Sequence, residues 1–115
     1  MNKIIILGRL AKDPDYKTLQ SGSTFCKLVV VDNHKDRDGN EVPDYFSCKA
    51  FGKTADFIGK YFTKGQKIVV FGKEVTESWE KDGTKHYQQT VIVSEVEFAG
   101  DAGQKNQAEE GGLFD

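Results

Sequence analysis

Three aromatic rings and two lysines fall within one ten-residue stretch, "DYFSCKAFGK", residues 44–53. A β-strand points successive side chains to opposite faces, so this stretch is predicted to have two different faces. One face is apolar and is predicted to join a core: Phe46, Cys48 and Ala50. The other face carries two rings, a hydroxyl and an ammonium group: Tyr45, Ser47, Lys49 and Phe51. A lysine between two rings is too polar to bury cheaply and too apolar for ordinary solvated surface, so we expect a ligand to dock on this face.

Rings and ammonium groups in this arrangement suit single-stranded nucleic acid. Bases stack on aromatic rings and cations follow the phosphates, and neither contact requires reading a sequence. Tyr45, Lys49 and Phe51 have the side chains that this chemistry needs. The alternative is structural: Phe51 closes one end of the core and Tyr45 packs under a loop. The pattern leaves both interpretations open.

Trp79 is a second candidate for stacking. It stands at the end of a predicted strand, just before the polar turn "EKDGTK", where a large indole would be partly exposed. A long hairpin with an aromatic ring near its tip can clamp a flexible strand; the alternative is an indole folded back over the core. Lys53 and Lys73 each follow a glycine and are candidates for phosphate contacts, or else simply solvated charges.

The last seven residues, "EEGGLFD", form the other unusual feature. Two apolar residues end an acidic segment that cannot bury enough surface to fold alone. Such a tip suits a hydrophobic pocket with basic surroundings on a partner protein. The alternative is a terminus with no role. The residues of the predicted partner-binding tip are Glu109, Glu110, Leu113, Phe114 and Asp115.

Catalytic constellations are not evident. The two histidines, His34 and His86, fall in or beside predicted hairpin loops, and neither has a serine or cysteine placed with it in a nucleophile motif. The glycines are scattered and form no phosphate-cradling loop. We therefore predict a protein that is not an enzyme and uses no cofactor.

Metal ligands are not predicted either. Cys26 and Cys48 lie on apolar strand positions without metal-ligand spacing, and are predicted to be buried free thiols, with a disulfide or a metal role as alternatives. Four carboxylates cluster in one hairpin loop: Asp36, Asp38, Glu41 and Asp44. A metal-dependent hydrolase or nuclease would need such carboxylates to converge on one face, whereas a solvated turn is the simpler interpretation.

Length and charge allow one small domain with a distinct end. The chain has 115 residues and a net charge of −2; residues 101–115 hold four acids and one lysine, a net −3, which leaves +1 for the rest. A charge this close to zero makes no case for nucleic acid by itself. The apolar run near the N-terminus is too short for a signal peptide or a membrane span, so we expect a cytoplasmic protein without a membrane partner.

The elements that must position these residues are mostly strands. We predict strands over residues 4–7, 24–33, 45–52, 67–79 and 86–98, and one helix within residues 53–65. Five strands with one helix between the third and fourth is the order of the OB-fold, a five-stranded Greek-key barrel. We therefore predict an all-β OB-fold domain with one short helix over residues 1–99, and a disordered acidic tail over residues 100–115.

Three segments resemble the bacterial and bacteriophage single-stranded DNA-binding proteins of the OB-fold type: "MNKIIILGRLAKDP", "FGKTADFIGKYFTKGQKIVVFGK" and "EEGGLFD". The resemblance covers nearly the whole chain. It implies sequence-tolerant binding of single-stranded DNA during replication, recombination and repair, without a catalytic step, by a homotetramer associated with the nucleoid. It also implies recruitment of replication or recombination proteins through the C-terminal tip.

Carried over by position, the resemblance implies roles for individual residues. The aromatic residues that match base-stacking positions of the family are Tyr45, Phe51 and Trp79. The lysines that lie along the usual path of backbone contacts are Lys53, Lys64 and Lys73. Together with His34 and Lys49, these six are the predicted nucleic-acid-binding residues.

Three positions depart from the family pattern. His34 stands where many members carry Trp or Phe, and Glu77 lies in a stretch that is often basic. At the tip, Phe114 is followed by Asp115 and no proline precedes it. The short tail and the small size of the chain are more like those of a phage-encoded or accessory member. A rival interpretation is an OB-fold interaction module whose aromatic face receives a peptide; the steep salt dependence of phosphate contacts would separate the two.

Overall fold

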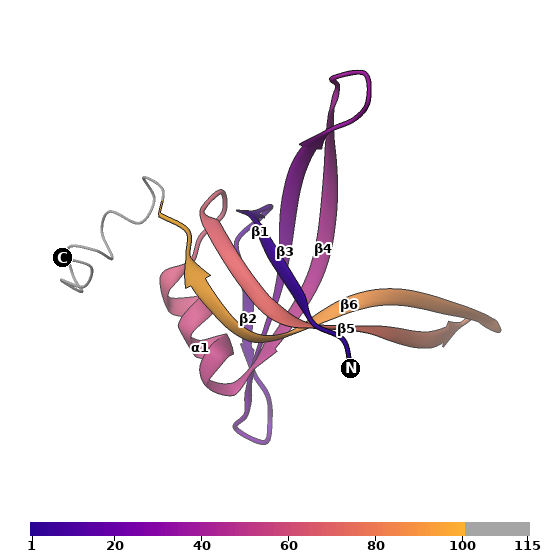
Figure 1. Cartoon of the computed structure of the whole chain (residues 1–115). Helices are drawn as coiled ribbons and strands as arrows, with labels where there is room; N and C mark the ends of the chain where they lie inside the picture. The colour runs from indigo at the N-terminus through magenta and orange to yellow at the C-terminus, as the bar shows by residue number, and fades with distance from the viewer. Residues whose placement is uncertain (101–115) are drawn as a thin grey trace.

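The computed structural model of the chain describes residues 1–100 and contains six strands and one helix (Figure 1). The elements, in order, are β1 (Ile4–Leu10), β2 (Asp15–Thr18), β3 (Thr24–Lys35), β4 (Glu41–Phe51), α1 (Gly52–Tyr61), β5 (Lys67–Lys81) and β6 (Thr84–Phe98). Among these residues, no helix is long and apolar enough to cross a membrane.

Five of the strands close into a barrel. The sheet runs in the order β1-β5-β6-β4-β3-β2, and β1 also pairs with β3 at Arg9 and Leu10, which joins the two sides of the sheet. Strands β4 and β6 pair in parallel at Cys48 and Val91, while every other pairing in the described residues is antiparallel. The predicted OB-fold and its single short helix are therefore confirmed.

The sixth strand, β2, was not predicted. It pairs with residues 24–27 of β3, and its four residues are all exposed. A strand without a buried face has no alternation of apolar and polar residues to reveal it.

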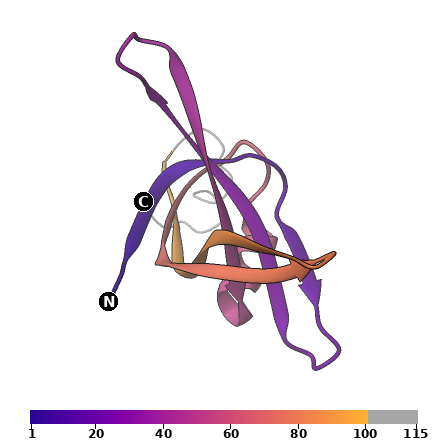
Figure 2. The same ribbon diagram turned by 90° about the vertical axis from the view of Figure 1, so that its right-hand side faces the viewer.

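Two β-hairpins extend past the barrel as arms that point in different directions (Figures 1 and 2). At the tip of the β3–β4 arm, the Asp36 carboxylate accepts the backbone N–H groups of Asp38 and Asn40, both at 2.9 Å. The β5–β6 arm turns at Asp82 and Gly83, which have φ values of 52° and 79°. Two central residues with positive φ match the twist of the flanking strands, so these strands continue to Lys81 and from Thr84, beyond the predicted ends.

The barrel interior is filled by alternate residues of the strands and capped by α1. Both cysteines are free and buried in it, as predicted. Burial disfavours the charged thiolate, which raises the pKa of Cys26 to about 11 and that of Cys48 to about 12. From the helix, Ala55 and Ile58 are fully buried against the same core.

Helix α1 is also fixed to β2 by one tyrosine. The Tyr16 hydroxyl donates a hydrogen bond to Oδ1 of Asp56 at 2.7 Å. The ring of Tyr16 lies so close to Gly59 that a Cβ added there would be 2.8 Å from Cδ1 of the ring. A side chain at position 59 would therefore push the ring and β2 away from the helix.

This contact predicts an unusual cost for a substitution that normally favours a helix. Gly59→Ala should lower the free energy of unfolding by about 1–3 kcal/mol because of the clash with Tyr16. In a Tyr16→Ala background the same change should be neutral or stabilise by up to about 1 kcal/mol, since alanine is the better helix former. Urea unfolding of the four chains measures both effects; a stabilising Gly59→Ala in the otherwise unchanged chain would contradict the contact.

Candidate nucleic-acid interface

A groove of about 320 Å³ runs between the outer face of β3 and β4 and the base of the β5–β6 arm. One wall is lined by Lys27, Ser47 and Lys49, and the other by Glu77, Gln88 and Thr90. The closed barrel holds both walls, because β4 and β6 are adjacent in the sheet. The groove is open along one side. Two pairs of stacked rings and one ion pair lie in or beside it.

The β4 face has the two-sided character expected from its sequence. Tyr45 and Phe51 are 65% and 51% exposed, whereas Cys48 and Ala50 on the opposite face are buried. Phe51 stacks on Phe25, its register partner in β3, with ring centroids 5.2 Å apart and an interplanar angle of 29°. Both rings therefore keep about half or more of their surface exposed in the folded chain.

Trp79 stands on the β5–β6 arm and is 46% exposed. Its ring stacks on His86, its cross-strand partner, with centroids 5.6 Å apart and an interplanar angle of 19°. Side chains alternate along β5, so Trp79 and Glu77 share a face and the indole lies farther out on the arm. The indole is therefore not folded back over the barrel. Sequence reasoning missed His86 as its partner, although the Asp82-Gly83 turn fixes the register that pairs them.

Lys49 and Glu77 form an ion pair across the groove. The Lys49 ammonium lies 3.1 Å and 2.9 Å from the two carboxylate oxygens of Glu77, and the Thr90 hydroxyl donates to one of them at 2.9 Å. The side chains of Lys49 and Glu77 are 27% and 33% exposed. The hydrogen bonds from Lys49 and Thr90 hold the pKa of Glu77 below its usual value. The charge of Lys49 is thus already matched inside the protein.

His34 lies apart from the groove. Its Nε2 is 2.8 Å from Oδ2 of Asp44, and alternation along the β3–β4 arm places both on the face opposite to Tyr45.

Lys53 and Lys64 also lie outside the groove. Lys53 lies in the first turn of α1 and lines a hollow beside Ser94 and Glu95 of β6. Lys64 is in the loop after the helix, where its backbone N–H donates to Oδ1 of Asp13 at 2.8 Å.

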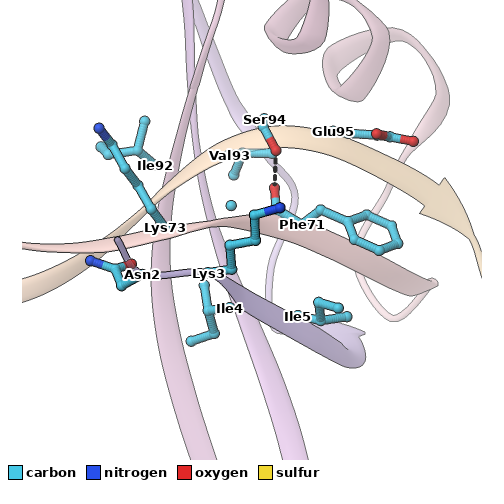
Figure 3. A pocket seen from close by; sticks show the side chains of 11 residues that line it. Asn2, Lys3, Ile4, Ile5, Phe71, Lys73, Ile92, Val93, Ser94 and Glu95 are labelled. Atoms are coloured by element: carbon cyan, nitrogen blue, oxygen red, sulfur yellow. Dashed lines mark hydrogen bonds between the residues drawn. The ribbon is translucent and has the colours of Figure 1, made fainter.

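Lys73 lines a different hollow, of about 490 Å³, on the side of the barrel formed by β1, β5 and β6 (Figure 3). Lys3 lines it too, and the Asn2 side chain extends the sheet here by donating to and accepting from the backbone of Glu74. The Ser94 hydroxyl donates to the Phe71 carbonyl at 3.0 Å (Figure 3).

The predicted residues therefore divide into two sets. Those gathered around the groove and its arm are Tyr45, Lys49, Phe51 and Trp79; those placed elsewhere are His34, Lys53, Lys64 and Lys73. The predicted tip residues lie outside the described residues. Within residues 1–100, no three or more His, Cys, Asp or Glu side chains come together as a metal site.

The lowered pKa of Glu77 predicts a pH-dependent contribution to stability. Because its pKa is lower in the folded chain than the usual value of 4.5, the carboxylate stabilises the fold fully above that value. This contribution is lost as the pH falls through the folded-state pKa. Glu77→Gln should therefore lower the free energy of unfolding near pH 7. The size of this loss, relative to wild type, should shrink as the pH falls below about 4.

Urea unfolding across this pH range measures the difference between the two chains. In a Lys49→Gln background the pH dependence should shrink, because Lys49 is the main cause of the lowered pKa. A difference between wild type and Glu77→Gln that does not change with pH would contradict the ion pair.

Comparison with known proteins matches this architecture to one family. The model of the single-strand binding protein family matches residues 1–99. The single-stranded DNA-binding protein of Fusobacterium nucleatum is 40% identical over 102 residues, which cover 85% of this chain and 66% of that protein. The single-stranded DNA-binding protein of Clostridium perfringens is 37% identical over 100 residues, covering 85% and 65%. That of Staphylococcus epidermidis is 34% identical over 118 residues, covering 100% and 88%.

The chain spans slightly less than two thirds of the length of the first two of these curated relatives. The family match nevertheless includes every strand and the helix of the described structure. The chain therefore belongs to the single-strand binding protein family.

Proposed function

We propose that this protein binds single-stranded DNA with little sequence preference, along the groove between the β4 face and the β5–β6 arm. The observation that carries the proposal is a pair of stacked aromatic platforms, Phe51 on Phe25 and Trp79 on His86. Phe51 is two residues from Lys49 and Trp79 is two residues from Glu77, and Lys49 and Glu77 line opposite walls of the groove. Base stacking contributes about 1–3 kcal/mol per base and tolerates any sequence. The names of the relatives support the same ligand.

In this role the protein would cover strands exposed in replication, recombination and repair, protect them from nucleases and prevent their re-annealing. Binding alone accomplishes this, so no catalytic step is needed. Exposed strands occur in the nucleoid, which is where the protein would act.

We also propose that it assembles as a homotetramer, as the family resemblance implies. Within the described residues, the backbone of residues 4–8 in β1 pairs with β5 on one side only, since pairing with β3 is confined to Arg9 and Leu10. Ile5 and Leu7 on this strand are 66% and 55% exposed. An open strand edge beside apolar side chains suits pairing with a second copy. Light scattering on the full chain measures the assembly directly.

Removing the rings tests the binding groove. Trp79→Ala and Phe51→Ala should each weaken binding of a thymidine oligomer by about 1–3 kcal/mol, which is about 5- to 150-fold in Kd, because one base loses its platform. Fluorescence anisotropy with a labelled oligomer gives the affinities, and circular dichroism checks the fold.

Tyr87→Ala is the matched control. Tyr87 is 65% exposed on the same arm, next to His86, but alternation points it to the opposite face. This variant should bind as the unchanged chain does. Full affinity in both Trp79→Ala and Phe51→Ala would mean that the groove is not the binding site. A shallow salt dependence of oligomer binding by the unchanged chain would favour a peptide ligand instead.

The C-terminal tip is proposed to recruit replication or recombination proteins through its two apolar residues and flanking acids. Deleting residues 109–115 should abolish capture of such partners while leaving DNA binding intact or slightly tighter, because the deletion removes negative charge. A pull-down with purified candidate partners, run beside an oligomer titration, separates the two effects. Equal recovery by the full and truncated chains would rule out the tip as the recruiting element.

A further inference from the structure

We propose that Glu77 is an affinity-setting residue: it acts as an internal counter-ion that removes Lys49 from the phosphate path, so that phosphates contact Lys27 and Lys12 instead. This inference rests on the proposed binding of single-stranded DNA. It assigns the phosphate contacts of the groove to Lys27 and Lys12 and leaves Lys49 in its ion pair.

The geometry around Glu77 favours a lasting pair over a transient contact. Lys49 approaches both carboxylate oxygens, and the Thr90 hydroxyl, on a residue only 1% exposed, donates to Oε1 as well. Both partners project from strands of the barrel sheet, 28 positions apart in the sequence. A phosphate can bind Lys49 only after the ion pair between Lys49 and the Glu77 carboxylate is broken.

Other lysines of the groove are not held in an ion pair in this way, although the positive charge of Lys27 also contributes to the lowered pKa of Glu77. Lys27 is the register partner of Lys49, is exposed, and holds its ammonium 6.0 Å from the centroid of the Phe25 ring. Lys12 also lines the groove. Within the described part of the chain, neither Lys12 nor Lys27 forms an ion pair; Asp15, across from Lys27 in β2, lies 3.7 Å from Lys17 instead.

These contacts predict how the strand lies. Phosphates gain most on the side of Lys27 and Lys12, where they release counter-ions without breaking a protein ion pair. Bases then stack on Trp79 of the arm and on Phe51 of β4, while Glu77 tolerates N–H donors but repels phosphates. Glu77 thus lowers the affinity of the groove below that of the same barrel with a neutral residue at this position.

The salt dependence of binding measures each part of this proposal. The logarithm of the binding constant falls with the logarithm of salt concentration by about 0.7 for each phosphate that a cation neutralises. Titrations of a labelled thymidine oligomer, from about 50 to about 200 mM salt, should show Glu77→Gln binding more tightly at low salt. Its slope should steepen by about 0.7, which is roughly a 2.6-fold larger loss of affinity over that range.

Lysine variants show which cation neutralises a phosphate. Lys49→Gln should keep the wild-type slope and bind more weakly, because it leaves Glu77 unpaired, whereas Lys27→Gln should make the slope shallower by about 0.7. The double variant Lys49→Gln with Glu77→Gln should return the slope to the wild-type value. Glu80→Gln is the matched control, with the same charge change on the same strand but on the opposite face, across from Lys85; it should not change the slope.

The proposal is overturned if Glu77→Gln binds no more tightly than wild type. It is also overturned if the salt slope of Lys49→Gln becomes shallower by about 0.7, the change expected of Lys27→Gln. Should Glu77→Gln fail to fold by circular dichroism, the comparison of Lys49→Gln with Lys27→Gln decides on its own. Failure of DNA binding itself is distinguishable, because then no variant, wild type included, would bind the oligomer.

Discussion

The close crossing of β1 over β3 at Gly8 is the constraint on which the rest of the structure depends. A Cβ at this position would lie 2.4 Å from the carbonyl oxygen of Val31, so only glycine lets the two strands approach. The crossing allows β1 to pair with β5 along most of its length and with β3 at its end, which closes the barrel. Closure sets where the β5–β6 arm leaves the barrel, and therefore the width of the groove.

In the proposed function, stacking rather than net charge explains how a nearly neutral protein would hold a polyanion. The chain carries a net charge of −2, and one lysine of the groove is neutralised by Glu77. The Phe25–Phe51 and Trp79–His86 platforms do not depend on charge, and each adds a base-sized surface. In the proposed complex, electrostatics would then adjust affinity and strand placement, through Lys27 on one wall and Glu77 on the other.

The sequence predicted what depends on local pattern and missed what depends on tertiary distance. Alternation around Lys49 identified both faces of β4, and the order of strands identified the barrel. Strand β2 escaped prediction because it buries no face. The link from Lys49 to Glu77 escaped because it requires a barrel closure that spacing does not reveal. The stacking of Trp79 on His86 was overlooked, although the Asp82-Gly83 turn sets the register that pairs them. Lys73 and Lys53 were both predicted as phosphate contacts because each follows a glycine. The folded chain places Lys73 in a hollow apart from the groove, which spacing in the sequence does not reveal.

The most direct test uses the single tryptophan of the chain. Titration of a thymidine oligomer while following Trp79 fluorescence, at low and high salt, reports whether bases reach the arm. We expect strong quenching at low salt that reverses at high salt, because stacking holds a base on the indole and phosphate contacts hold the strand nearby. Unchanged fluorescence, under conditions where a labelled oligomer binds, would contradict a binding groove that includes Trp79.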